Sequence, residues 1–332
     1  MAAPDPFAAV RSAFGRAIAP VLDRASGPAV LGAYRLGEVL AQHTPREFGD
    51  PLLSAAGRAA SLRGGDRRTI VERNLRRVYG RDLTRNELNS KVHATFESYA
   101  RYYYDSFRLT GMSVKEVADG FTVDGIEHIE AAMDQDEVGP VLALPHLGGW
   151  EWAAFWITRV RNWGLAAVVE QLEPPELFEW FLGFRTSLGM NIIPLSPTAA
   201  DEVAMAAANK EIVCLLCDRD LTHAGPEVEF FGETTSLPAG PAVMALRGGC
   251  RVLPTAVYFT EQGVHGVVRP PIEIKRAGGA TSIRDDVVRF TQVLATELEG
   301  LISRAPEQWH LLQPNWPSDY EALGLEAPER RR

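Results

Sequence analysis

From about residue 122 onward, short β-rich apolar runs alternate with helical patterns, and this alternation constrains the fold more than any other feature. The candidate strands are residues 141–145, 165–170, 191–195, 212–218, 252–259 and 267–274. Helical patterns occupy residues 150–160, 174–188, 198–209 and 238–247, and a last helix is expected at 283–303. Such alternation predicts an α/β fold with a mainly parallel central sheet flanked by helices.

The first third of the chain has the pattern of helices. Apolar residues recur at helical spacing over residues 7–21, which predicts an amphipathic helix that either lies in a membrane interface or covers the core. Thr84 and Glu87 form a capping box ahead of an apolar stripe, so a long helix should begin there and bury that stripe. We expect a helical, basic, membrane-facing region at 1–111, an α/β core at 112–318 and a flexible tail at 319–332.

The charges are distributed unevenly along the chain. The whole sequence has 34 basic and 43 acidic residues, and this net charge of −9 argues against a general nucleic-acid binder. Residues 1–111 nevertheless carry a net charge of +6 and the remainder −15, with nine arginines between residues 58 and 85. This asymmetry predicts an anionic membrane surface as the partner of the N-terminal region, and ordinary solvated helix faces are the alternative.

Three cysteines among 332 residues cannot build a disulfide framework, and they indicate a reducing, cytoplasmic compartment. Cys214 and Cys217 form a Cys-x-x-Cys inside an apolar run, where we expect buried strand cysteines rather than a redox pair or half a zinc site. The longest apolar stretch, residues 141–157, contains His146 and Glu151 and is not expected to span a membrane. We expect no metal ion and no cofactor.

A candidate centre for chemistry follows the first strand of the α/β region. His146 comes directly after this strand, Gly148 and Gly149 permit a tight turn, and Glu151 follows in the next helix. Ligands of open α/β sheets bind at the carboxyl ends of strands. A carboxylate that folds back to the imidazole would fix its tautomer and leave the other nitrogen free to take a proton. The alternative is a histidine that caps a helix and a glutamate at its positive end.

Three further polar patches raise the expectation of an active centre. They are Phe181-Leu-Gly-Phe-Arg185, Asp218-Arg219-Asp220 followed by Glu227-Val-Glu229-Phe-Phe-Gly232, and Ser236-Leu-Pro-Ala-Gly240. Arg185 could hold a phosphate, and the charges that follow the apolar strand indicate a polar site. The helix that begins near Gly240 offers backbone amides to an anion. A surface arginine and structural ion pairs are the alternatives.

Several catalytic motifs are absent from the sequence. It contains no Gly-x-Ser-x-Gly, no Walker loop, no dinucleotide-binding Gly-x-Gly-x-x-Gly and no His-Glu-x-x-His. A serine hydrolase, a nucleoside triphosphatase and a zincin protease are therefore poor candidates.

The order of these motifs resembles that of the bacterial lipid A biosynthesis acyltransferases. The resemblance rests on His146 with Glu151, on Arg185, on Asp218-Arg219-Asp220 with Phe230-Phe-Gly232 and Leu237-Pro-Ala-Gly240, on Val252-Leu-Pro254 and on Pro306-Glu-Gln-Trp309. It covers roughly residues 70–314. Within that family, the segments at 218–222, 227–233 and 309–314 look most like those of actinobacterial phosphatidylinositol mannoside acyltransferases.

The resemblance implies a glycerolipid acyltransferase-like fold and a direct transfer, in which a histidine deprotonates an acceptor hydroxyl that attacks a thioester. His146 would be the base. The family motif offers Glu151 as its partner, but the mannoside acyltransferases are expected to use a later acid, for which we favour Asp220 over Asp218 and Glu229. Backbone amides near Gly148, Gly149 or Gly240 would stabilise the oxyanion.

The remaining expectations concern the substrates. Arg185 and Arg219 are the candidates for phosphate or acceptor contacts, with Asp218 and Glu229 nearby. Aromatic side chains of the helix after Gly149 would either wall an acyl tunnel or only fill the core; they are Trp150, Trp152, Phe155 and Trp156.

The expected enzyme is a peripheral protein on the cytoplasmic face of the inner (plasma) membrane. It would move a palmitoyl-like chain from acyl-CoA, with acyl carrier protein as the alternative donor, to a mannose hydroxyl of a phosphatidylinositol mannoside. The alternatives are another glycolipid acceptor such as a lipid A precursor, a non-catalytic lipid-binding protein of the same fold, and a metal-dependent hydrolase that uses His146, Glu151 and Asp218.

Overall fold

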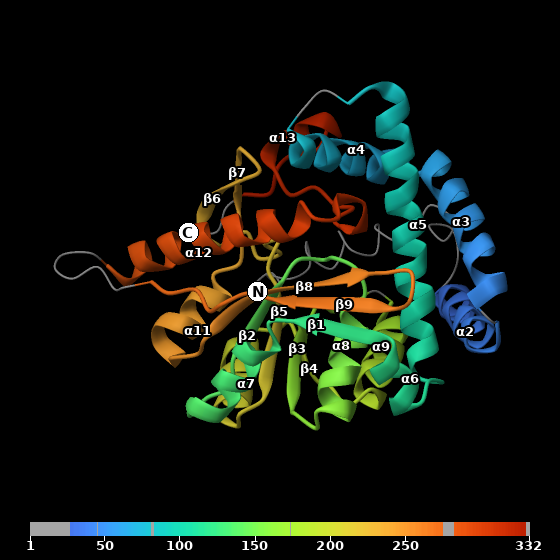
Figure 1. The fold of residues 1–332 in the computed structure, drawn as a ribbon. Coiled ribbons are helices and arrows are strands. Elements are labelled where there is room, and N and C mark those ends of the chain that lie inside the picture. Colours follow the sequence, from blue (N-terminus) through green and yellow to red (C-terminus); the bar gives the residue numbers. More distant parts are fainter. Residues whose placement is uncertain (1–26, 45, 81–82, 173, 275–281, 330–332) are drawn as a thin grey trace, which may run out of the picture.

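A computed structural model describes residues 27–44, 46–80, 83–172, 174–274 and 282–329. Its centre is a seven-stranded sheet in the order β1-β9-β8-β2-β5-β3-β4 (Figure 1). Neighbouring strands are parallel except for β8 and β9, which are antiparallel. The predicted α/β fold with a mainly parallel sheet is confirmed.

The strands of this sheet are short. They are β1 (Phe121–Asp124), β2 (Val141–Leu144), β3 (Leu165–Val169), β4 (Asn191–Pro194), β5 (Ile212–Leu216), β8 (Val252–Phe259) and β9 (Val264–Val268). The helices that follow them are α7 (Ile126–Gln135), α8 (Trp150–Phe155), α9 (Pro175–Ser187), α10 (Ala199–Ala208), α11 (Gly240–Gly248) and α12 (Ile283–Ile302). A π-helical turn, η1 (Trp156–Val160), extends α8.

Each face of the sheet has its own hydrophobic core, because successive side chains of a strand point to opposite faces. In β2, Val141 and Ala143 belong to the core beneath α10, α11 and α12, whereas Leu142 and Leu144 belong to the core beneath α8 and α9. Strands that are buried on both faces require apolar residues at every position. The continuous apolar runs in the sequence therefore identified the central strands.

Four strands differ from the sequence prediction. β9 begins at Val264, three residues before the predicted strand at 267–274. β1 was not predicted, because its four residues alternate between exposed and half-buried at the edge of the sheet. The strands β6 (Glu227–Phe230) and β7 (Glu233–Ser236) form a separate antiparallel hairpin. It begins with residues of the acidic motif, for which no strand was predicted.

The N-terminal region is helical in its described part. α2 (Gly27–His43), α3 (Arg46–Arg63) and α4 (Gly65–Tyr79) precede α5 (Arg85–Leu109), and α2 and α3 both contact α5 (Figure 1). The predicted capping box of Thr84 and Glu87 is confirmed, and it starts α5 as expected. The amphipathic helix predicted at 7–21 lies outside the described residues.

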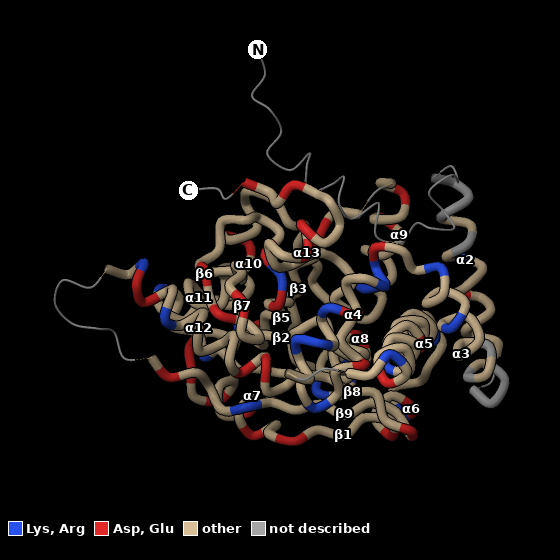
Figure 2. The backbone as a smooth tube through the Cα atoms, turned by 90° about the horizontal axis from the view of Figure 1, so that it is seen from above, with Lys and Arg blue, Asp and Glu red and all other residues tan. Residues whose placement is uncertain are grey.

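The arginine-rich segment of this region forms many ion pairs. Basic residues are visible along α3, α4 and α5 in Figure 2, and acidic residues are frequent near α7 and β1. Arg68 pairs with Glu72 in α4, and Arg58 pairs with Glu97 of α5. Part of the basic cluster therefore has acidic partners within the protein.

The predicted tail begins inside a helix. α13 (Pro317–Ala322) contains Asp319, which is fully buried. Its carboxylate accepts bonds from Arg73 at 2.6 Å and Arg77 at 2.7 Å, both on α4. The boundary at residue 319 thus falls within a segment that is packed on the N-terminal helices.

Two further sequence expectations concern burial. Among the residues that the structure describes, no helix combines the length and the apolar character needed to cross a membrane. Cys214 and Cys217 are buried free thiols, as predicted, and Cys250 is also a buried free thiol. Burial raises the pKa of Cys214 to about 12, so this group remains a neutral thiol.

Candidate active site

The register of two parallel strands brings His146 and Asp218 together. β2 and β5 are hydrogen-bonded neighbours in which Leu144 is paired with Leu216. His146 and Asp218 each lie two residues beyond this pair, at the same carboxyl edge of the sheet. This edge is where open α/β sheets bind ligands.

Asp218 holds His146 through both carboxylate oxygens. Oδ1 lies 2.7 Å from the imidazole Nδ1, and Oδ2 accepts the backbone N–H of His146 at 3.0 Å. Because a carboxylate only accepts, Nδ1 carries the proton and the lone pair is on Nε2. The histidine side chain is 36% exposed, and none of the described residues bonds to Nε2. Nε2 can therefore take a proton from a bound substrate.

The Asp218 carboxylate is completely buried and receives a third donor. The indole Nε1 of Trp309 lies 2.7 Å from Oδ2. Burial alone would raise the pKa of Asp218, but the charge of a protonated His146 and the N–H donors of His146 and Trp309 lower it below its usual value. Asp218 therefore stays ionised and can stabilise an imidazolium.

The glycines after His146 permit a close approach of two backbones. Gly148 has a φ of +58°, and a Cβ built on it would lie 1.9 Å from the Val257 carbonyl oxygen. Its N–H donates to the Gln308 carbonyl at 3.1 Å, so this amide is already engaged and is not the predicted oxyanion donor. Gly149 precedes α8, and Gly240 is exposed where α11 begins.

Glu151 forms its hydrogen bonds with residues other than His146. Its Oε1 accepts from the Tyr102 hydroxyl at 2.6 Å and from Nη2 of Arg185 at 3.0 Å. Glu151 is 1% exposed, and the Arg185 guanidinium also lies over the rings of Trp150 and Phe181. The two predicted site residues thus form a buried ion pair that joins α5, α8 and α9.

The structure also corrects the choice of acid. Asp220 does not contact His146: its carboxylate accepts from the backbone N–H groups of Thr222 and Gly225, at 3.0 and 2.7 Å, and so closes its own loop. Glu229 is exposed on the hairpin strand β6. Asp218, which was only an alternative, is the carboxylate on the imidazole, because strand register rather than sequence spacing decides which side chain faces it.

One polar residue at this edge was missed. Glu170 directly follows β3, the other neighbour of β5, and its Oε1 is buried without a hydrogen-bond partner among the described residues. Burial raises the pKa of Glu170 to about 7, although the charges of Arg219 and His146 oppose this shift. The rule that singled out His146, a polar residue directly after an apolar strand, would have found it.

Arg219 and His310 also lie near the pair of His146 and Asp218. Nη1 of Arg219 donates to Oε1 of Gln313 at 3.0 Å, and burial lowers its pKa. Burial, with a smaller effect of His146, lowers the pKa of His310 to about 3, so its ring is neutral near pH 7. Nε2 of His310 lies 2.9 Å from the Ser98 hydroxyl. The ring of His146, by contrast, is 36% exposed.

The aromatic residues of α8 pack in the core. Trp150, Trp152 and Phe155 are buried, and the indole of Trp152 donates to the Val117 carbonyl at 3.1 Å. Trp156 packs on Phe121. In the part of the chain that the structure describes, His146, Glu151 and Asp218 do not form a group that could hold a metal ion.

Comparisons with known proteins show the family of this chain. The family model described as bacterial lipid A biosynthesis acyltransferase matches residues 31–318. The phosphatidylinositol mannoside acyltransferase of Mycolicibacterium smegmatis (strain ATCC 700084 / mc(2)155) is 34% identical over 290 residues, which cover 86% of this chain and 91% of that protein. The protein of the same name from Mycobacterium tuberculosis (strain ATCC 25618 / H37Rv) is 36% identical over 231 residues, which cover 68% and 70%. The chain belongs to the bacterial lipid A biosynthesis acyltransferase family and is an acyltransferase.

Proposed function

We propose that this acyltransferase moves a long, palmitoyl-like acyl chain from acyl-CoA to a mannose hydroxyl of a phosphatidylinositol mannoside, with His146 as the general base. The observation that carries the proposal is the half-exposed imidazole of His146, whose Nδ1 is bound to the buried Asp218 carboxylate. The names of the two relatives support the acceptor, and the family resemblance supports the thioester donor.

The chemistry follows from the position of the proton. Nε2 of His146 takes the proton of the acceptor hydroxyl while that oxygen attacks the thioester carbonyl and forms a C–O bond. The tetrahedral intermediate then expels the CoA thiolate, which receives the proton from the imidazolium. Asp218 stabilises the imidazolium between the two steps, as a triad aspartate does. A positioned base of this kind contributes about 10²- to 10⁴-fold to the rate.

The same proposal places the enzyme on the cytoplasmic face of the inner (plasma) membrane as a peripheral protein. Large apolar side chains are exposed on α2 and α3, among them Leu36 at 58% and Leu62 at 74%. The neighbouring Arg35 and Arg63 are exposed as well. Apolar residues flanked by arginines suit the boundary between anionic headgroups and acyl chains.

The test is an acyl-transfer assay with palmitoyl-CoA and a mannosylated phosphatidylinositol, followed by mass spectrometry of the lipids. The wild type should add one palmitoyl mass to the lipid, and His146→Ala should lose this activity. Asp220→Asn is the matched control, because Asp220 is close in sequence but does not touch His146.

The other outcomes point to the alternatives. Acylation of a lipid A precursor but not of the mannoside would replace the acceptor and keep the mechanism. Full activity of His146→Ala would refute the base, and no thioester turnover with any acceptor would favour a lipid-binding protein.

A further inference from the structure

The segment around Trp309 is hydrogen-bonded to the loop that carries His146. Leu147 and Trp309 form an antiparallel bridge. Gly148 donates its N–H to the Gln308 carbonyl at 3.1 Å, and His310 donates its N–H to the His146 carbonyl at 2.7 Å. The backbone of residues 308–310 therefore holds the loop through hydrogen bonds to the residues before and after Leu147.

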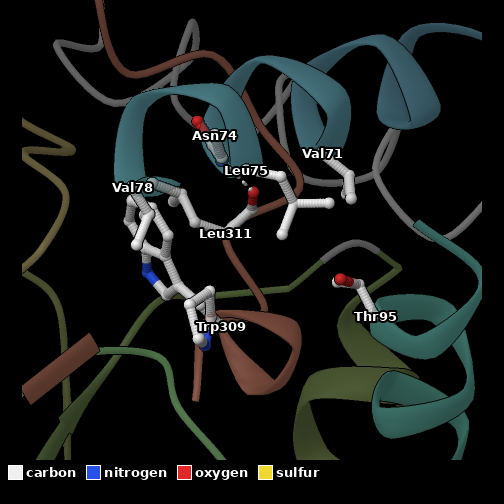
Figure 3. Close-up of a pocket in the computed structure, with 8 residues that line it drawn as sticks. Val71, Asn74, Leu75, Val78, Thr95, Trp309 and Leu311 are labelled. Atoms are coloured by element: carbon white, nitrogen blue, oxygen red, sulfur yellow. Dashed lines mark hydrogen bonds between the residues drawn. The ribbon is translucent and has the colours of Figure 1, made fainter. Parts of the chain in front are cut away.

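The Trp309 side chain also donates a hydrogen bond to the carboxylate of Asp218. It is 3% exposed, and its Nε1 lies 2.7 Å from Oδ2 of Asp218. Figure 3 shows Trp309 on the side of α4 that carries Val71, Asn74 and Leu75, with Asn74 bonded to the Leu311 carbonyl at 2.8 Å. In this part of the described chain the space between these side chains has no room for a water molecule. The Trp309 ring is therefore closely packed against α4 and Leu311.

We propose that Trp309 is a positioning residue of the active site, whose indole N–H holds the Asp218 carboxylate in the orientation that keeps His146 ready to accept a proton. This inference rests on the proposed role of His146 as the base. Without the indole, Oδ2 would keep only the backbone N–H of His146 as a donor, at 3.0 Å. The less stabilised carboxylate would then bind a proton or an imidazolium more strongly.

Trp316 provides a matched control in the same aromatic cluster. The rings of Trp309 and Trp316 lie 6.3 Å apart and edge to face. Trp316 is also fully buried, but its Nε1 donates to the Phe230 carbonyl at 3.2 Å. Trp309→Phe and Trp316→Phe each remove one buried indole N–H, and only the first N–H reaches Asp218.

The first experiment is an NMR titration of histidine-labelled protein, in which His146→Ala assigns the His146 signals. Among the described residues, Asp218, Glu170 and His310 are titratable groups that interact electrostatically with this ring, and both variants keep all three. In Trp309→Phe the pH midpoint of the His146 ring should rise by about half a unit or more, because a carboxylate that loses a donor attracts the imidazolium more strongly. In Trp316→Phe it should match the wild type. Equal midpoints in the wild type and Trp309→Phe would overturn the inference, as would equal shifts in both variants.

The assay of the proposed function adds a second readout. Half a unit corresponds to about a threefold loss of kcat/KM at a pH below the midpoint, with little change at high pH. A loss that is the same at every pH would indicate only a structural role. If His146→Ala remains fully active, the proposed base is refuted, but the NMR titration still tests the link between Trp309, Asp218 and His146.

A measurement on the wild type covers the case in which Trp309→Phe does not fold. The indole N–H signal of Trp309, assigned by triple-resonance spectra, should shift with pH at the midpoint of His146, while the signal of Trp316 should not. A Trp309 signal that does not respond to this titration would overturn the inference.

Discussion

Asp218 approaches His146 at two atoms, with Oδ1 2.7 Å from Nδ1 and Oδ2 3.0 Å from the backbone nitrogen. We predict that Asp218→Asn lowers kcat about 10³- to 10⁴-fold, because an amide nitrogen facing Nδ1 would favour the wrong tautomer. Asp220→Asn should retain most of the wild-type kcat. Equal losses in the two variants, measured by acyl transfer at saturating substrate, would show that the contact with His146 is not what matters.

Glu170 should make the protein less stable as the pH rises. Its pKa is raised to about 7 in the folded state, so between the unfolded value of about 4.5 and pH 7 the folded state holds more protons and loses stability with increasing pH. We predict that Glu170→Gln matches the wild type near pH 4.5 and exceeds its unfolding free energy by about 2–3 kcal/mol at pH 8. Urea denaturation at the two pH values measures this difference.

The control for this experiment is Glu179→Gln on α9, whose side chain is exposed. This variant should follow the wild type at both pH values. A Glu170→Gln variant with the same dependence on pH as the wild type would contradict the raised pKa of Glu170.

The Glu151–Arg185 pair should matter for stability. The two side chains are 1% and 15% exposed, and removal of one partner leaves the other charge buried without its counterion. We predict that Glu151→Ala lowers the unfolding free energy by about 3–5 kcal/mol. Lys115→Ala, which breaks an exposed pair with Asp119, should leave it almost unchanged. If Glu151→Ala instead kept full stability and lost acyl transfer, Glu151 would act in the reaction itself.

Membrane binding should depend on the exposed apolar residues of α2. We predict that the double variant Leu36→Ser, Leu40→Ser binds vesicles that contain phosphatidylinositol at least about tenfold more weakly, since each leucine contributes about 1–2 kcal/mol when it is buried. Co-sedimentation measures the bound fraction. Met205→Ser is the control, because Met205 is equally exposed but lies on α10, across the sheet. Unchanged binding of the double variant would exclude this face of α2 as the contact.

The central strands, and His146 as a candidate site residue, could be predicted from the sequence. β2, β5 and β8 are buried on both faces, so their apolar runs stand out, and His146 follows one of them directly. β1, β6 and β7 have only four residues each, with polar residues among them, and these carry too little pattern for a prediction.

The partners of His146 could not be predicted from local pattern. The choice between Asp218 and Asp220 depends on the pairing of Leu144 with Leu216, which is a property of the folded sheet. Glu151 was assigned to His146 because it is near in sequence, but Arg185, 34 residues further on, holds it. The bond from Trp309 to Asp218 spans 91 residues, and no spacing rule reaches that far.

That separation also sets an order of events during synthesis. Asp218 is made 91 residues before the indole that completes its set of donors, which at about 5–20 residues per second amounts to roughly 5–18 s. During this interval the residues of β2 and β5, with His146 and Asp218, have already been synthesised, but the carboxylate lacks its third donor. A nascent chain therefore contains the base and its carboxylate before it contains the indole that aligns them.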